Sequence, residues 1–418
     1  MAKKKVVNED TIQDDLYATI AGDTGGDILG ELENCKFFVD TGTLATNYIC
    51  SGRFLTGGIP GQRITEVYGP SASGKSLIAS NVLFGCQKMG GWAIILDCEN
   101  ATNADWMEKA SHLNTNRVIR YTPFTLEEAF LKMHNAVKKI RALEIKMKKE
   151  RKPIVIVYDS ISVSPCEREY RETELPEDYT PAQWKTIVGA KEQPGERARI
   201  CGKELRKIAP LLEKEDVTIL IINQTREKIG VLYGSPETTA GGGKSLEFYA
   251  SCRLRTSAKK KIENKALKTF SGINMQVENR KNRAFRPFSK HEGIKLYFDT
   301  GINPLTGLLT ALLEDERVIA VGKGGNYSVA PEYLPEDKTE VKFKSSLERN
   351  DVPLQVLLDC PKLIDATSKE EIEQYLAPFQ AAIDFTNSGN FVEKIVAFDA
   401  DGNAMEIEDE EDEIDDEE

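Results

Sequence analysis

The stretch GPSASGKS at residues 69–76 restricts the fold of this chain more than any other feature. It fits the pattern G-x-x-x-x-G-K-[S/T], follows an apolar run, ITEVYG at 64–69, and precedes a helical pattern, LIASNVLFGCQ at 77–87. A phosphate-binding loop requires this order of strand, glycine-rich turn and helix, because the glycines let consecutive backbone N–H groups face a phosphate at the positive end of the helix. The sequence therefore predicts a nucleotide site at the start of this helix.

The side chains of this stretch have the chemistry that a nucleoside triphosphate needs. The amine of Lys75 is long enough to reach the β- and γ-phosphates, and the hydroxyl of Ser76 is a ligand for Mg²⁺. We expect the whole loop to line the site: Gly69, Pro70, Ser71, Ala72, Ser73, Gly74, Lys75, Ser76 and Leu77. A second stretch, TTAGGGKS at 238–245, has Thr238 where the first glycine is required, so we do not expect it to bind phosphate.

Short apolar runs alternate with amphipathic helical patterns from residue 64 onward. Runs of strand type lie at residues 64–69, 93–99, 154–160 and 218–224. The last three are almost continuously apolar, which is typical of strands buried on both faces of a parallel sheet. The alternation predicts an α/β fold with a mostly parallel central sheet flanked by helices.

Residues 125–152 carry the longest helical pattern. It opens with a predicted capping box formed by Thr125 and Glu128, and apolar side chains then recur at helical spacing. Its lysines and arginines are most simply the solvated face of that helix. Further strands at 273–282 and 292–299 are expected to extend the sheet.

Polar side chains end three of the predicted strands. A carboxylate such as Asp159, at the end of a buried strand beside the phosphate loop, is where Mg²⁺ is held, although such a residue could also cap the next turn. Glu99 could polarise an attacking water, and we favour it over Asp97, which should lie deeper in the sheet. The amide of Gln224 could contact the γ-phosphate. This set predicts a nucleotide site that hydrolyses.

Composition excludes several classes of protein. The 418 residues contain no apolar run of transmembrane length, and the start, MAKKKVVNED, has no signal-peptide core, so we expect no membrane partner and a cytoplasmic location. The eight cysteines stand singly, as reduced thiols do, and a zinc site is not expected. The net charge of −12 comes mainly from residues 406–418, which hold eleven acidic groups; 56 of the 67 acidic groups then remain against 55 basic ones.

The segment KIGVLYGSPETTAGG at 228–242 is rich in Gly, Ser and Thr, yet it carries apolar side chains where a surface loop is normally polar. This segment and five other stretches resemble the RecA family of strand-exchange recombinases in their order and spacing. The other stretches are EVYGPSASGKS, LDCENA, IVIVYDS, the INQTRE that precedes this segment, and LEFYASCRLR. The resemblance covers residues of about 60–300. The later GIKLYFDTGINPLTGLLTALLE and the acidic end look closer to the recombinases of large phages.

The resemblance implies a RecA-like ATPase core that binds ATP and Mg²⁺. In it, Lys75 and Ser76 are the phosphate and metal ligands, Asp159 the metal carboxylate, Glu99 the general base and Gln224 the sensor.

The resemblance also implies residues at two further places. Trp106 takes the place of an aromatic that stacks on adenine and Asn103 that of a polar group beside the base, although Trp106 could equally be a core aromatic. Lys281 and Arg283 match basic residues that reach the ATP of a neighbouring protomer, or they are strand-edge charges.

Two segments are implied to bind DNA. The second, at about 225–245, would hold single-stranded DNA through Arg226, Lys228, Ile229, Gly234, Gly241 and Gly242, with Ile229 as a wedge between bases. The first, at about 163–200, is longer and more acidic than expected. Arg199, at its end, and Arg206, just after it, are implied to contact DNA. Residues 259–268, KKKIENKALK, are a duplex-binding patch or, as we slightly prefer, a solvated hairpin.

The implied organisation has four parts. Residues 1–55 form an N-terminal helix and protomer contact, 56–332 the ATPase core, 333–405 a small C-terminal domain, and 406–418 a disordered acidic tail. The tail either improves solubility or competes with a polyanion for the chain's own basic groups.

The leading hypothesis is an ATP-dependent recombinase that polymerises on single-stranded DNA and exchanges strands with a homologous duplex. Its partners would be both DNA forms, further copies in a helical filament, and mediator and single-strand-binding proteins. A hexameric helicase would share Lys75, Asp159 and Glu99 but has no evident use for the segment at 228–242. A filament regulator without turnover is the third alternative, and the presence of Glu99 and Gln224 argues against it.

Overall fold

The structure is a computed structural model that describes residues 16–17, 19–21, 23–24, 35–178, 180–188, 195–227, 237–239, 241–322, 324–345, 350–398 and 404–406. Contacts divide the chain into two units between Lys36 and Phe37. In the first unit, the described residues between 16 and 24 have helical backbone. The second unit contains all the elements discussed below.

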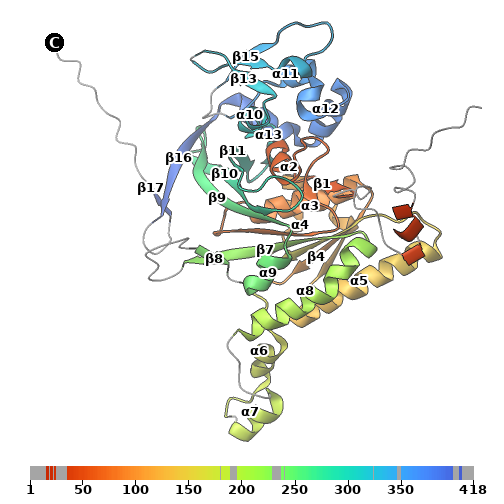
Figure 1. Cartoon of the computed structure of the whole chain (residues 1–418). Helices are drawn as coiled ribbons and strands as arrows, with labels where there is room; N and C mark the ends of the chain where they lie inside the picture. Colours follow the sequence, from red (N-terminus) through yellow and green to blue (C-terminus); the bar gives the residue numbers. More distant parts are fainter. Residues whose placement is uncertain are drawn as a thin grey trace, which may run out of the picture. The chain divides into compact units, whose positions relative to one another are not determined.

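A central sheet organises the second unit (Figure 1). Its strands lie in the order β12 (Gly301–Ile302), β11 (Lys290–Tyr297), β10 (Thr269–Asn282), β9 (Cys252–Asn264), β3 (Ile64–Gly69), β7 (Val217–Glu227), β6 (Ile154–Asp159), β4 (Trp92–Asp97) and β5 (Val118–Tyr121). The strands from β9 to β5 are parallel, and β10, β11 and β12 continue the sheet antiparallel. This confirms the predicted mostly parallel sheet.

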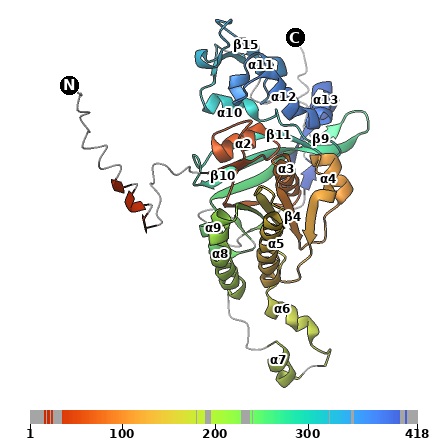
Figure 2. The ribbon, with the colours of Figure 1, turned by 90° about the vertical axis from the view of Figure 1, so that its right-hand side faces the viewer.

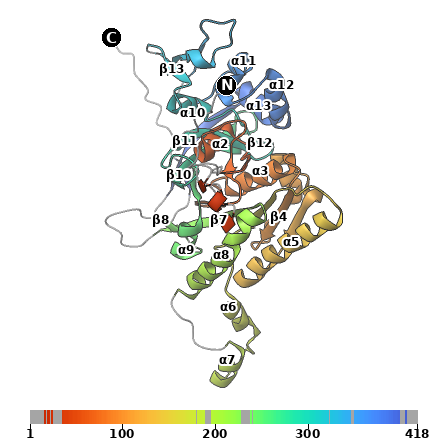
Figure 3. The same cartoon turned by 45° about the vertical axis from the view of Figure 1, so that its right-hand side comes forward.

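Helices cover both faces of the sheet, because the side chains of the buried strands alternate between two cores (Figures 1 and 3). On β6, Val155 and Val157 pack with one core, and Ile154 and Ile156 with the other. The first core contains α2 (Leu44–Ser51), α3 (Lys75–Lys88) and α4 (Ala104–Ser111), and the second contains α5 (Leu126–Lys146) and α8 (Glu196–Lys214).

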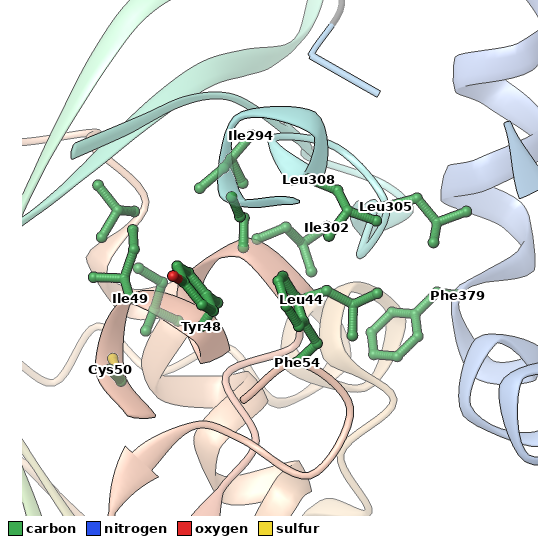
Figure 4. Packing of buried hydrophobic residues seen from close by; sticks show 14 of the residues in the cluster. Leu44, Tyr48, Ile49, Cys50, Phe54, Ile294, Ile302, Leu305, Leu308 and Phe379 are labelled. Carbon is green, nitrogen blue, oxygen red and sulfur yellow. The ribbon is translucent and has the colours of Figure 1, made fainter. Parts of the chain in front are cut away.

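The first core reaches into the C-terminal part of the chain. Figure 4 shows Leu44 and Tyr48 of α2 packed near Ile294, Leu308 and other apolar side chains from β11 onward. The elements that follow are α10 (Leu308–Glu314), β13 (Val318–Ala320), β14 (Asn326–Val329), β15 (Lys342–Lys344), α11 (Leu354–Asp359), α12 (Lys369–Leu376) and α13 (Gln380–Ser388).

The remaining elements are short or return to the main sheet. They are β1 (Phe38–Val39), β2 (Ile59–Pro60), α6 (Glu167–Arg171), α7 (Pro181–Ile187), β8 (Glu237–Thr239), α9 (Gly243–Tyr249), β16 (Phe391–Phe398) and β17 (Ala404–Glu406). Single 3₁₀ turns are η2 (Thr115–Arg117), η3 (Glu172–Glu174), η4 (Pro331–Tyr333), η5 (Pro361–Ile364) and η6 (Ala377–Phe379). Strand β16 pairs with the far half of β9 and so extends the central sheet, and β17 pairs with β16. Among the described residues, none of the helices combines the length and apolar character of a membrane span.

Two observations bear on the predicted domain boundaries. The contact division follows Lys36, whereas the sequence predicted a boundary at residue 55. Strands β14 and β15 lie on either side of the predicted boundary at 333, yet they pair with each other. The acidic tail beyond residue 406 lies outside the described residues.

The predicted helix at 125–152 is shorter than expected. Thr125 accepts a hydrogen bond from the N–H of Glu128 at 3.1 Å, as predicted, but the Glu128 carboxylate accepts from Phe124 at 2.9 Å, so the predicted capping box is wrong in its second bond. The helix ends at Lys146 because the backbone of Lys148 is left-handed, with φ of 51°. Residues 259–268 lie in the hairpin of β9 and β10, and the β9 arm of this hairpin also pairs with β16.

The predicted first DNA segment is not a simple loop. Its described residues form α6, η3 and α7, which Figure 2 shows projecting beyond α5 and α8. The base of α6 is held by Arg168, which pairs with Glu196 at the start of α8, and by contact between the tilted rings of Phe124 and Tyr170, whose centroids lie 5.5 Å apart. A helical projection therefore replaces the expected loop.

Candidate functional site

The turn after β3 has the backbone that a phosphate-binding loop needs. A Cβ atom at Gly69 would lie 2.2 Å from the carbonyl oxygen of Thr256, and one at Gly74 would lie 2.6 Å from the sulfur of Met275. Gly74 also has a left-handed backbone, with φ of 89°, at the start of α3. A 2.7 Å hydrogen bond between the hydroxyls of Ser73 and Thr256 fastens the turn to β9.

Lys75 points back into this turn. Its side chain is buried, and its Nζ donates to the carbonyl oxygens of Gly69 at 3.0 Å and Pro70 at 2.5 Å. Burial lowers the pKa of Lys75, and the charges of Asp159 and Glu99 partly oppose this shift. The amine therefore lies among the groups that the sequence placed around the terminal phosphates.

Two cavities adjoin the start of α3. The first, of about 190 Å³, is lined by Ala72, Ser73, Gly74, Lys75, Ser76, Leu77, Trp106, Ile273, Leu296 and Phe298. The second, of about 260 Å³, is lined by Ser76, Ala79, Ser80, Ile95, Glu99, Ala101, Thr102, Asn103, Trp106, Met107 and Asp159. Ser76 and Trp106 line both, so the predicted metal ligand and the predicted aromatic border one continuous region.

Asp159 ends β6 within reach of this region. Burial, followed by the negative charges of Glu99 and Asp97, raises the pKa of Asp159 to about 7, while Lys75 and a hydrogen bond with Ser76 act in the opposite direction. A crowded carboxylate of this kind gains from a divalent cation, because the cation removes the repulsion. The oxygens of Ser76 and Asp159 are ligands of the type that Mg²⁺ prefers.

Glu99 and Gln224 meet at the edge of the sheet. The carboxylate of Glu99 accepts hydrogen bonds from the Ser160 hydroxyl at 2.7 Å and from the Gln224 amide at 3.2 Å. The structure thus brings the predicted base and the predicted sensor into contact, which the sequence did not show.

Asp97 has a different surrounding from Glu99. It is 2% exposed, pairs with Arg120 at 2.7 Å, and accepts a hydrogen bond from the N–H of Thr102 at 3.1 Å. Burial raises the pKa of Asp97, but the hydrogen bonds from Thr102 and Arg120 outweigh it and hold the pKa below its usual value. These partners occupy the carboxylate, which supports the choice of Glu99.

Asn103 and Trp106 lie at the start of α4. The Asn103 side chain caps this helix by accepting from the N–H of Trp106 at 3.0 Å, and the indole of Trp106 donates to the carbonyl oxygen of Phe298 at 2.9 Å. The side chain of Phe298 is 41% exposed and lines the first cavity. Sequence reasoning missed Phe298; the signal was an aromatic residue near the end of the predicted strand at 292–299.

Lys281 and Arg283 do not join the phosphate loop of their own chain. The register of the sheet pairs Asn282 with Cys252, and Cys252 with Thr65, which is near the start of β3. The phosphate loop follows the other end of β3. The two basic residues therefore lie near the end of the sheet where β3 begins, and the nucleotide site lies at the other end, where β3 finishes.

The two basic side chains contact the end of α9 instead. Lys281 donates to the carbonyl oxygens of Glu247 at 2.6 Å and Phe248 at 3.0 Å, and Arg283 lies 3.5 Å from the latter oxygen. Burial, followed by the positive charge of Arg283, lowers the pKa of Lys281.

The residues predicted to bind DNA are described only in part. Arg199 and Arg206 are exposed on α8, where Arg199 forms an ion pair with Glu196 at 3.5 Å. Gly241 and Gly242 are buried just before α9. The side chain of Arg226 and all of Lys228, Ile229 and Gly234 lie outside the described residues.

Comparison with known proteins places this geometry in a family. Residues 28–164 and 185–303 match a family sequence model described as the RecA N-terminal domain. The unmatched residues 165–184 contain α6 and the start of α7. Most of the helical projection therefore lies outside the matched residues.

Curated relatives match across most of their length. The chain is 30% identical over 343 residues to "Protein RecA" of Mycoplasma mobile, which covers 82% of this chain and 91% of that protein. It is 30% identical over 339 residues to "Protein RecA" of Thermus aquaticus, covering 77% and 88%. "Protein RecA" of Thermus thermophilus is 31% identical over 303 residues, covering 72% and 78%. With the phosphate loop, the strand order and these matches together, the chain belongs to the RecA family.

Proposed function

We propose that this protein is an ATP-dependent DNA recombinase. It polymerises on single-stranded DNA as a helical filament, pairs it with a homologous duplex and exchanges strands, and DNA stimulates its hydrolysis of ATP. The observation that carries the proposal is the hydrogen bond between Gln224 and Glu99. This bond supports a sensor role for Gln224, because the residue contacts the proposed base and also precedes the 228–242 segment.

In this proposal, ATP and Mg²⁺ bind at the start of α3. The loop from Gly69 to Leu77 holds the phosphates, Lys75 neutralises the β- and γ-phosphates, and Ser76 and Asp159 hold the metal, which supplies charge stabilisation to the transferred phosphoryl group. Trp106 contacts the base, together with Asn103.

Glu99 accepts the proton of the attacking water. Its carboxylate is oriented by Ser160 at 2.7 Å and by Gln224 at 3.2 Å. A base held by two donors keeps one position, which lowers the entropic cost of aligning the water. Loss of the γ-phosphate changes what the Gln224 amide contacts, and the segment after it responds.

The place of Lys281 and Arg283 supports filament formation. They lie at the opposite end of the strands from their own phosphate loop, and this position supports a role towards the nucleotide of another copy. We propose that they complete the catalytic site of a neighbouring protomer. The nucleotide then bridges two copies, which links ATP binding to polymerisation.

DNA binding is assigned to the two segments around α8 and α9. Arg226 and Lys228 contact phosphates, the backbone at Gly234 approaches the strand closely, and Ile229 separates bases. Gly241 and Gly242, which the sequence predicted as DNA contacts, are buried and instead fix the far end of the segment. Arg199 and Arg206 contribute from α8. These contacts carry no sequence information, as a recombinase requires.

The organisation and origin remain part of the proposal. We propose an N-terminal protomer contact within residues 1–55, a core at 56–332, a C-terminal region at 333–405 and an acidic tail at 406–418. We also propose a phage-type member that works in the host cytoplasm with mediator and single-strand-binding proteins.

Electron microscopy with ATP and single-stranded DNA tests the assembly. We expect helical filaments that require both ligands. Joint-molecule formation between a single strand and its homologous duplex tests the reaction. Closed rings that unwind DNA with fixed polarity would instead identify a helicase, and single-strand binding without joint molecules would contradict strand exchange.

The raised pKa of Asp159 predicts a stability that depends on pH. Because its pKa of about 7 lies above the usual 3.8, the folded protein binds more protons than the unfolded chain between these values. The free energy of unfolding of the metal-free protein should therefore fall as the pH rises from 4 to 7. Asp159→Asn should be more stable than the wild type by on the order of 2 kcal/mol at pH 8, and by much less at pH 4.

Urea unfolding at both pH values measures this difference. Asp105→Asn, which removes an exposed carboxylate from α4, controls for the loss of one negative charge. An equal effect of Asp159→Asn at the two pH values would show that the carboxyl pKa is not raised.

Deletion of residues 406–418 tests the competitor role of the tail. The deletion removes eleven acidic groups, so we expect several-fold tighter binding of duplex DNA at low salt. The gain in affinity should shrink as salt rises, because screening weakens the attraction between the acidic tail and the basic groups for which it competes. Fluorescence anisotropy against salt measures it, with a tail of equal length in Gln and Asn as the charge-free control. Unchanged duplex binding in both variants would leave solubility as the role of the tail.

A further inference from the structure

A buried polar cluster lies beside the nucleotide site and takes no part in the proposed chemistry. Glu66 of β3 and Asn223 of β7 are both 0% exposed, and Arg253 of β9 is 8% exposed. The Glu66 carboxylate accepts from the amide of Asn223 at 2.8 Å and from the guanidinium of Arg253. Burial lowers the pKa of Arg253, but the charge of Glu66 outweighs it and raises the pKa. Removing a buried charge or amide from water is costly, so such a cluster is kept where its geometry matters.

Asn223 uses all its hydrogen-bonding capacity in this cluster. Besides Glu66, its amide donates to the carbonyl oxygen of Gly241 at 2.9 Å, and its oxygen accepts from the N–H groups of Gly241 and Gln224, both at 3.0 Å. Asn223 thus binds both backbone groups of Gly241 while it adjoins Gln224 in sequence. The Asn223 side chain thus links β7, which carries the proposed sensor Gln224, to Gly241 at the far end of the 228–242 segment.

Gly241 packs tightly against Ile161. A Cβ atom there would lie 2.9 Å from backbone and side-chain atoms of Ile161, which follows the metal carboxylate strand β6 by two residues. The near end of the segment is equally constrained, because Thr225 pairs with Thr239 in the β7–β8 ladder. Both ends of the proposed DNA segment are therefore held against strands that end at the nucleotide site.

The same cluster reaches the other end of α9. Arg253 donates to the Glu247 carboxylate at 2.8 Å, and the amine of Lys281 binds the carbonyl oxygens of Glu247 and Phe248. Helix α9 is thus connected at its start to Asn223, through Gly241, and at its end to Arg253 and Lys281. A displacement of the segment's far end would be transmitted along this short helix to Lys281.

We infer that Asn223 is a positioning residue that couples nucleotide sensing to the DNA segment, with Glu66 fixing the orientation of its amide. It acts through Gly241 and contacts neither nucleotide nor DNA. Through α9, the same contact sets the position of Lys281 towards the next protomer. This inference rests on the proposed function, since it explains how ATP at one site changes the grip on DNA at another.

The affinity for single-stranded DNA in two nucleotide states tests this inference. The measured quantity is the ratio of the Kd for an oligo(dT) strand with ADP to the Kd with a non-hydrolysable ATP analogue. We expect a ratio of about 10 or more for the wild type and of about 2 or less for Asn223→Ala. Nucleotide affinity itself should stay within about threefold, because the phosphate loop is unchanged.

Asn47→Ala is the matched control for this substitution. Asn47 is also 0% exposed, and its amide donates to one carboxylate, that of Asp40 at 2.9 Å, and one carbonyl, that of Phe54 at 3.0 Å. It lies in α2 on the other core, so its removal should cost comparable stability and leave the ratio unchanged. Asn223→Ser, which retains a hydroxyl, is the milder variant if Asn223→Ala does not fold, and an intermediate ratio is expected. Glu66→Gln retains an acceptor for Asn223 and should keep most of the coupling.

The outcomes separate the inference from the proposed function. A wild-type ratio near 1 would contradict the proposed function itself. A wild-type ratio of about 10 that Asn223→Ala or Asn223→Ser retains would overturn the role of Asn223 alone. An equal loss of the ratio in Asn47→Ala would show that general destabilisation, and not this contact, weakens the coupling.

Discussion

Lys75→Ala should abolish ATP hydrolysis, with a loss of roughly 10³-fold or more in the DNA-stimulated rate. The amine of Lys75 is buried in the phosphate loop, and among the residues that the structure describes, no other amine or guanidinium lines either of the two cavities. Removing it leaves the charge that develops on the phosphates uncompensated, and a loss of this size corresponds to about 4 kcal/mol of barrier. Phosphate release with saturating single-stranded DNA measures the effect.

The control for Lys75→Ala is Lys88→Ala at the other end of the same helix. Lys88 pairs with Asp40 at 2.7 Å and lies far from the phosphate loop along α3. Its substitution should lower stability slightly and leave hydrolysis unchanged. Near-normal turnover in Lys75→Ala would refute the assignment of the nucleotide site.

Glu99→Gln should slow hydrolysis by roughly 10²- to 10³-fold while ATP still binds and filaments still form. The structure explains why ATP binding and filament formation should persist. Both contacts of Glu99, from Ser160 and Gln224, are made to one carboxylate oxygen, and a glutamine side chain keeps an oxygen there. Only the capacity to take a proton is lost. Single-turnover hydrolysis and filament imaging with ATP measure the two halves separately.

Glu108→Gln on α4 is the control for the loss of one carboxylate. The side chain of Glu108 is exposed and accepts a hydrogen bond from Thr115, away from both cavities. It should change neither rate nor assembly. If Glu99→Gln no longer bound nucleotide, Glu99 would be a structural residue.

The two predictions together distinguish binding from chemistry. Lys75 acts on charge that is present in ATP and grows during transfer, so its loss affects binding and rate. Glu99 acts on the water, so its loss affects the rate alone. If Glu99→Gln forms filaments with ATP while Lys75→Ala does not, assembly responds to bound ATP and not to its hydrolysis.

Much of the core could be predicted from local patterns. The strand at 64–69 and the turn after it are contiguous, so spacing along the chain decides their geometry, and the structure confirms the strand with the same bounds. Buried strands are recognisable because both faces must be apolar. The helix at 125–152 was predicted too long because helical spacing continues past Lys146, while the left-handed backbone at Lys148 ends it.

Other features could not be predicted because they depend on pairing between distant segments. Nothing in the sequence near Lys281 indicates that it lies opposite its own phosphate loop; the register of β10, β9 and β3 places it there. In the sequence, Asn223 is one polar residue near the end of an apolar strand. Its proposed positioning role can be inferred only because the fold brings Glu66 and Gly241 within hydrogen-bond distance of its side chain. The pairing of β16 with β9, across more than a hundred residues, is of the same kind.

The sequence by itself determined the kind of site, because a phosphate loop and its strand-end carboxylates are set by residues that are close along the chain or that end adjacent parallel strands. Only the tertiary structure decided which polar groups meet and which are kept apart. That decision rests on strand register, where a shift of one residue turns every side chain to the other face, and short sequence patterns do not carry that information.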